Sequence, residues 1–128
     1  MNFGARLNEV FKASENLKKK GVKITIVDAR FAKPLDENLI WQLATTHEAI
    51  MTIEEGSIGG FGSHVVNFLS KKGLLDTNLK FRSMTLPDIF IDQDIPDNMY
   101  KVANLDSSSI EEKVLDVLNS NIILQKQK

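Results

Sequence analysis

The chain has 128 residues, of which 42% are hydrophobic and 26% charged, and these proportions are typical of a single globular domain. Its 16 basic and 17 acidic residues give a formal net charge of -1, which argues against nucleic acid or a membrane surface as a main partner. Cysteine is absent, which excludes disulfides and thiolate chemistry, and no apolar run reaches the roughly 20 residues that span a bilayer. We therefore expect a soluble intracellular domain.

The first part of the chain alternates between helical and extended patterns. Apolar residues at helical spacing predict an amphipathic helix over 5–20, and Gly21 ends it. The β-branched residues that alternate in 22–27 predict a strand. After a loop, the apolar positions from Leu35 to Leu43 predict a second helix, with Asp36 placed to cap its first turn.

The second part of the chain continues the alternation. Ser108 and Ser109 each stand three residues before a glutamate, and these two overlapping capping boxes predict the start of the last helix. In order, the sequence predicts a strand at 49–53, a glycine-rich loop at 56–63, a helix that carries Val65 and Leu69, a strand at 79–84, a short helix at 96–102 and the last helix from Ser108 or Ser109.

Strict alternation of strands and helices predicts one α/β domain. Such an order favours a mostly parallel sheet with helices on both faces, which is a three-layer α/β/α arrangement. We assign residues 1–120 to this domain and residues 121–128 to a tail.

The most conspicuous candidate site follows the strand at 49–53. Glu54 and Glu55 end this strand, and a loop with four glycines leads from them into a helix. The glycines match neither a dinucleotide-binding fingerprint nor a phosphate-binding P-loop, so nucleotide binding is the weaker interpretation. Because neighbouring residues on a strand point to opposite sides, we expect one glutamate to cap loop amides and the other to meet solvent or a partner. The glycines then allow a close approach of backbone or a positive φ.

Four further residues are candidates for interface or channel contacts. His64 lies in the first turn after the glycine loop, and Asp28 and Arg30 end the strand at 22–27, where a salt bridge between them is the simpler interpretation. Trp41 lies off the apolar stripe of its helix, so it is either a subunit contact or covered by a neighbouring segment. We assign no catalytic, cofactor-binding or metal-binding residue.

Four segments carry a resemblance to a known family. They are Asn2-Phe3-Gly4, the run D-A-R-F-A-K-P-L-D at 28–36, the run E-E-G-S-I-G-G-F-G-S-H-V at 54–65, and Leu86-Pro87-Asp88. Over residues 1–118 the chain resembles the C-terminal domain of the 1-deoxy-D-xylulose-5-phosphate synthases, which belong to the transketolase superfamily. The link at 88–97 departs from the family pattern, since Ile89 stands where arginine is common and Gln93-Asp94 stands where His-Gly is common.

The resemblance implies a fold, an activity and partners. The family fold is an α/β/α domain with a mixed five-stranded sheet, and by this comparison the chain would be N-terminally truncated, without one strand and most of another. The full-length enzyme uses thiamine diphosphate and Mg²⁺ to decarboxylate pyruvate and join the two-carbon unit to glyceraldehyde 3-phosphate, for isoprenoid, thiamine and pyridoxal biosynthesis. The N-terminal and middle domains of the same enzyme hold the cofactor, and the C-terminal domain supports a homodimer. This segment alone is therefore expected to be inactive and to bind neither cofactor nor metal.

Two alternatives stay open. In the first, the chain is the equivalent domain of a transketolase or of a 2-oxoacid dehydrogenase decarboxylase component. In the second, it is a free-standing module that binds an anion or a nucleotide through its glycine loop. The frequent lysine, isoleucine and asparagine fit a bacterial cytoplasm or a plastid-type stroma.

Overall fold

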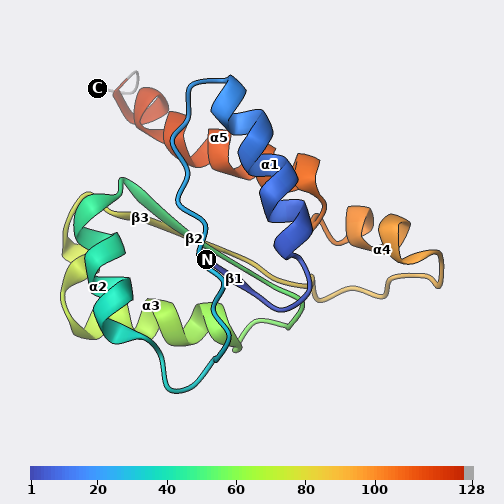
Figure 1. Cartoon of the computed structure of the whole chain (residues 1–128), viewed down its shortest axis with the longest axis horizontal. Helices are drawn as coiled ribbons and strands as arrows, with labels where there is room; N and C mark the ends of the chain where they lie inside the picture. Colours follow the sequence, from blue (N-terminus) through green and yellow to red (C-terminus); the bar gives the residue numbers. More distant parts are fainter. Residues whose placement is uncertain (126–128) are drawn as a thin grey trace.

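A parallel sheet lies between two pairs of helices in the computed structural model of the chain, which describes residues 1–125 and the side chains of 1–119 (Figure 1). Its strands are β1 (Asn2–Phe3), β2 (Ala49–Glu54) and β3 (Lys80–Met84), in the order β1-β2-β3 and all parallel. In register, Asn2 is paired with Ile53, and Ala49 is paired with Lys80. The parallel arrangement expected from the alternating sequence is confirmed.

The helices cover both faces of the sheet, as the three-layer arrangement requires. On one face α1 (Leu7–Lys19) packs against α5 (Ser107–Gln125), and on the other face lie α2 (Glu37–Thr46) and α3 (Phe61–Lys71) (Figure 1). A single 3-10 turn (Leu74–Asp76) follows α3, and α4 (Pro96–Val102) lies at the end of a long link after β3. Among the described residues, no helix is long and apolar enough to span a bilayer.

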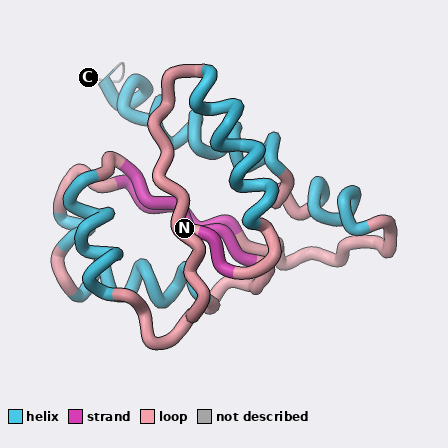
Figure 2. The backbone as a smooth tube through the Cα atoms, in the orientation of Figure 1, coloured by secondary structure: helices cyan, strands magenta, loops and turns pink. Residues whose placement is uncertain are grey.

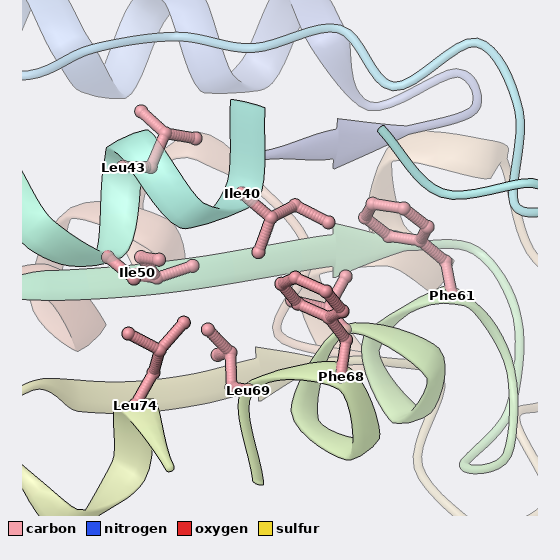
Figure 3. Close-up of a cluster of buried hydrophobic side chains, with 9 residues drawn as sticks. Ile40, Leu43, Ile50, Phe61, Phe68, Leu69 and Leu74 are labelled. Atoms are coloured by element: carbon pink, nitrogen blue, oxygen red, sulfur yellow. The ribbon is translucent and has the colours of Figure 1, made fainter. Parts of the chain in front are cut away.

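Each face of the sheet has its own hydrophobic core. On the α2 and α3 side, buried apolar side chains from both helices meet Ile50 of β2 and point toward one another (Figure 3). On the α1 and α5 side, Val10 and Ala13 of α1 pack with Ile53 of β2 and Ile110 of α5. Since β2 contributes to both cores, the central strand is apolar along most of its length, which is typical of a parallel sheet covered on both faces.

The strand predicted at 22–27 is not formed, and this prediction is wrong. The segment is drawn as loop in Figure 2, and the isolated parallel bridge nearest to it joins Asn2 to Asp28, one residue past its end. Two hydrogen bonds hold that end, from Asn2 N to Val27 O (2.7 Å) and from Ala29 N to Asn2 O (2.8 Å). Because β1 has only two residues, the described chain offers residues 22–26 no neighbouring strand, and an alternating pattern without a hydrogen-bonding neighbour remains extended loop.

The last helix also differs from its prediction. It begins at Ser107, so Ser108 and Ser109 lie inside its first turn and do not cap it. Instead Ile110 N donates to Asp106 O, and Ser109 Oγ donates to the Asp106 carboxylate. Residues 121–125, which we placed in a tail, continue α5, and 126–128 lie outside the described residues.

Candidate functional site at the carboxyl end of the sheet

Glu54, the last residue of β2, is a buried carboxylate that binds the start of α3. Its side chain is 2% exposed, and its two oxygens accept from Phe61 N (3.0 Å) and Gly62 N (2.6 Å). The first amides of a helix lack partners within the helix and carry its positive dipole end, so a carboxylate is a favourable acceptor there. The prediction that one of the two strand-end glutamates caps loop amides is confirmed.

The glycine loop is shaped around this carboxylate. A Cβ atom on Gly60 would stand 2.0 Å from Glu54 Oε1, and one on Gly56 would stand 2.7 Å from the same atom. A Cβ atom on Gly62 would stand 2.6 Å from Thr52 Oγ1, whereas Gly59 has open space but a φ of +110°. Both predicted uses of glycine, close approach and positive φ, are therefore present in one loop.

Glu55 points to the opposite side of β2 and ties three elements together. Its Oε2 accepts from Ala5 N (3.3 Å), Arg6 Nε lies 3.2 Å from its Oε1, and Tyr100 of α4 donates its hydroxyl to Oε1. The Arg6 guanidinium also lies over the Tyr100 ring, 3.4 Å from its centroid. The hydrogen bond to the Glu55 carboxylate, with desolvation second, raises the pKa of Tyr100 above its usual value of 10.0. Glu55 thus anchors α4 and the start of α1 to the end of β2.

The other candidate residues are dispersed. His64 is half-buried on α3, and the hydrogen bonds and ion pairs of the described residues include none from its side chain. Asp28 and Arg30 are both exposed, and no ion pair joins them in the described part of the chain, so the expected salt bridge is wrong. Trp41 remains 46% exposed on the outer face of α2, so neighbouring segments cover only part of it.

The contacts of Glu54 and Glu55 hold elements of the fold together, and they do not assemble reactive groups. Glu54 and Glu55 lie on opposite faces of the sheet, each held by backbone or side-chain partners, so they do not form an acid/base pair. Phosphate binding at the α3 amides conflicts with the carboxylate that already occupies two of them. The described residues also contain no group of three histidines, cysteines or carboxylates placed to hold a metal ion.

Sequence reasoning missed two members of this site, Arg6 and Tyr100. They lie 49 and 45 positions from Glu55 along the chain, and no spacing rule joins residues at such separations. Only the fold brings the start of α1 and the short helix α4 to the same end of β2. Figure 1 shows both elements near the carboxyl ends of the strands.

Fold and site together define a class: a parallel α/β/α domain whose strand-end carboxylates hold its own backbone and helices in place. A family model described as the transketolase C-terminal domain matches residues 1–110. The chain therefore belongs to the transketolase C-terminal domain family.

A solved structure supports the same fold. It is described as "Split gene transketolase, inactive beta4 tetramer", and it is similar to this chain with a TM-score of 0.78 and 24% identity over 92% of this chain. The chain covers 37% of the length of that protein. At this identity the likeness establishes the fold, and the activity of a longer enzyme is a matter for proposal.

Proposed function

We propose that the chain acts as the C-terminal, dimer-supporting domain of a 1-deoxy-D-xylulose-5-phosphate synthase. In that role it works with the N-terminal and middle domains of the enzyme, which condenses pyruvate with glyceraldehyde 3-phosphate, releases CO₂ and supplies isoprenoid, thiamine and pyridoxal biosynthesis. The enzyme would lie in a bacterial cytoplasm or a plastid-type stroma. The two long motifs at 28–36 and 54–65 favour this family over other transketolase-type enzymes.

The observation that carries the proposal is the use of the second motif for structure. Its first glutamate, Glu54, is buried against the amides of α3, and its glycines at 56, 60 and 62 leave space for that carboxylate or for β2. A motif used in this way fixes the shape of the loop that follows β2. A domain that shapes loops, and whose Glu54 and Glu55 are each held by structural partners, is suited to supporting an active site built elsewhere.

Thiamine diphosphate and Mg²⁺ belong to the proposed enzyme, but the residues of this chain do not fit them. The candidate diphosphate cradle at the start of α3 is filled by Glu54, and the described residues hold no metal-ligand cluster. We therefore derive no step of the reaction through this chain. In the proposed enzyme the cofactor is held by the other domains.

Exposed apolar side chains mark the surface suited to contact those domains. The carboxyl ends of parallel strands meet at one edge of a sheet, and an exposed apolar side chain follows each of them here. These side chains are Phe31 after the segment at 22–28, Ile58 after β2 and Phe90 after β3. Ile58 is 81% exposed and Phe90 is fully exposed. Large apolar residues exposed along one edge are typical of an interaction surface.

The proposal is tested by reconstitution. The chain is co-expressed with a synthase polypeptide of this family that contains only the N-terminal and middle domains. We expect a stable complex by light scattering, and formation of 1-deoxy-D-xylulose 5-phosphate, detected by mass spectrometry, from pyruvate and glyceraldehyde 3-phosphate with thiamine diphosphate and Mg²⁺. A complex that transfers a two-carbon unit only from a ketose phosphate would favour the transketolase alternative. The absence of any complex would refute the proposal.

The alternative of a free-standing anion-binding module has a simple test. Phosphate and nucleotides at high concentration should leave the melting temperature unchanged, because the amides of α3 already have a carboxylate acceptor. A ligand at 100 times its dissociation constant stabilises a protein by about 2.7 kcal/mol, so binding would be readily detected.

A further inference from the structure

The link between β3 and α4 is an acidic segment that projects from the domain. In Figure 1 it leaves the carboxyl end of β3, passes beyond the ends of α1 and α5, and returns as α4. Residues 83–100 contain four aspartates and no lysine, arginine or histidine, so they carry a formal charge of -4, whereas the whole chain carries -1. The negative charge of the chain is therefore concentrated in this segment.

Large apolar side chains are exposed along the same segment. Among the described residues, nine large hydrophobic side chains are exposed, and four of them lie within residues 89–102. Single exposed apolar residues are common on protein surfaces, whereas a concentration of them marks an interaction site. The four are Ile89, Phe90, Ile95 and Val102.

The exposed carboxylates of Asp88 and Asp92 have no partner among the described residues. No hydrogen bond or ion pair in that part of the chain reaches either of them. Asp94 differs, because its carboxylate caps the start of α4 and accepts from Ile95 N (2.7 Å) and Asn98 Nδ2 (2.9 Å). Asp88 and Asp92 are therefore free to pair with a second molecule.

Contacts with the domain hold this segment at both ends and in its middle. At its start Leu86 N donates to Gly56 O (2.9 Å), and at its end the Tyr100 hydroxyl donates to Glu55. Between them, Ile91 packs against the core on the α1 and α5 side. A loop held in this way loses less conformational freedom on binding, so its exposed side chains are suited to specific recognition.

Phe90 and the two free carboxylates form one compact motif. Asp88 and Asp92 stand two residues before and two residues after Phe90, so each Cα atom lies within about 7 Å of the Cα atom of Phe90. The Phe90 side chain is fully exposed. An aromatic ring between two carboxylates is complementary to an apolar pocket with a cationic rim.

Arginine is the cation that fits such a motif best. Its guanidinium group can pair with a carboxylate and stack on an aromatic ring at the same time. The chain itself contains this combination, since Arg6 pairs with Glu55 (3.2 Å) and lies over the Tyr100 ring (3.4 Å to its centroid).

We propose that residues 88–92 are a docking loop, which inserts Phe90 into an apolar pocket rimmed by arginine or lysine on the polypeptide that carries the N-terminal and middle domains of the synthase. This inference rests on the proposed function and names a contact within it. Phe90 is the buried anchor, and the two aspartates pair with the rim. An anchor chiefly sets the dissociation rate, whereas rim charges chiefly set the association rate and its dependence on salt.

The anchor is tested by binding kinetics. The probe is the synthase polypeptide with only the N-terminal and middle domains, immobilised for biolayer interferometry, and the 128-residue chain is in solution. We expect Phe90→Ala to raise the dissociation rate at least about tenfold and to leave the association rate nearly unchanged.

The rim is tested by two pairs of substitutions. Asp88→Asn with Asp92→Asn should slow association about three- to tenfold at low salt and should flatten its dependence on salt. Asp88→Lys with Asp92→Lys should weaken binding by at least about a further tenfold, because like charges would then face each other across the interface.

The chain offers matched controls outside the loop. Phe11→Ala removes an exposed aromatic side chain from α1, and Glu15→Gln with Asp76→Asn removes two exposed carboxylates. These chains should bind as the unmodified chain does. Since all of these positions are exposed, none of the variants should shift the urea unfolding transition, which separates a loss of docking from a loss of fold.

The outcomes distinguish this inference from the proposed function. A complex with unchanged kinetics in Phe90→Ala would overturn the docking loop and leave the proposed function in place. Equal effects of the asparagine and lysine pairs, or tighter binding of the lysine pair, would overturn the cationic rim. The absence of any complex with the unmodified chain would refute the proposed function and the docking loop together.

Discussion

Alanine at Gly60 should destabilise the domain through one atom of one side chain, Glu54 Oε1. The Cβ atom would stand 2.0 Å from that oxygen and 3.1 Å from Glu54 Cδ, which is far inside van der Waals contact. The carboxylate must then rotate, and it loses its 3.0 Å bond to Phe61 N. If this is the whole cause, removing the carboxylate should remove the cost of the alanine.

The magnitudes follow from the bonds involved. Gly60→Ala sacrifices one charged hydrogen bond, which costs about 1.5–3 kcal/mol. Glu54→Ala leaves two amides at the start of α3 without their acceptor and costs about 2–6 kcal/mol, at about 1–3 kcal/mol for each unsatisfied buried group. In the double variant the clash with the carboxylate is absent. The double variant should thus resemble Glu54→Ala alone, with a coupling energy of about 2 kcal/mol.

The assay is urea unfolding of the four chains followed by circular dichroism at 222 nm. Gly59→Ala is the matched control, because Gly59 has a φ of +110° and a Cβ atom added there would meet nothing within 4 Å. Its cost is backbone strain, so it should add to that of Glu54→Ala within about 0.5 kcal/mol. Glu54→Gln is a second control, since it keeps the atom that clashes and should keep most of the cost of Gly60→Ala.

Additive energies for Glu54→Ala and Gly60→Ala would refute this reasoning. They would mean that Gly60 is needed for its own backbone conformation and that the carboxylate does not shape the loop. The proposal that the second motif is structural would lose its main support as well.

Further predictions concern single groups. Tyr100 is the only tyrosine in the chain, so absorbance at 295 nm reports its titration alone. Its hydroxyl should ionise above pH 10 in the folded chain and nearer to pH 10 in the Glu55→Gln variant, and equal titration curves would contradict the hydrogen bond to Glu55. Burial lowers the pKa of the Met1 α-ammonium from 8.0 to about 6, so the folded state binds this proton less tightly than the unfolded chain does. The free energy of unfolding should therefore rise by about 2 kcal/mol from pH 6 to 8. N-acetylation should remove that part of the rise, and identical pH profiles of the two chains would argue against burial of the ammonium. Ile58→Glu should change the free energy of unfolding by less than about 0.5 kcal/mol, because the side chain is 81% exposed, and should weaken the reconstituted synthase complex in light scattering; an unimpaired complex would place the contact elsewhere.

Local signals predicted those elements whose partners are close along the chain. Asp36 was expected to cap the second helix, and its carboxylate accepts from Leu39 N at 3.0 Å. The short helix expected at 96–102 begins at Pro96, where the missing N–H of proline costs nothing. Alternation along β2 also predicted that Glu54 and Glu55 would point apart. In each case the deciding interaction lies within a few residues or in the pleat of one strand.

Interactions between distant segments could not be predicted in this way. The contacts of Glu55 with Arg6 and Tyr100 depend on where α1 and α4 meet the sheet, and no residue pattern encodes that distance. The Asp28–Arg30 salt bridge failed for a related reason. Both side chains are exposed, and an exposed pair gains too little from Coulomb attraction to fix two side chains in one geometry.

The segment at 22–27 explains how an alternating pattern can be correct about side chains and wrong about secondary structure. Ile26 packs toward the α1 and α5 core and Val27 toward the α2 core, as on the two faces of a pleated strand. What residues 22–26 lack, in the described part of the chain, is a hydrogen-bonding neighbour, since β1 bonds only to Val27 and Ala29. Alternation reports a place at a half-buried sheet position, whereas strand assignment also requires a partner.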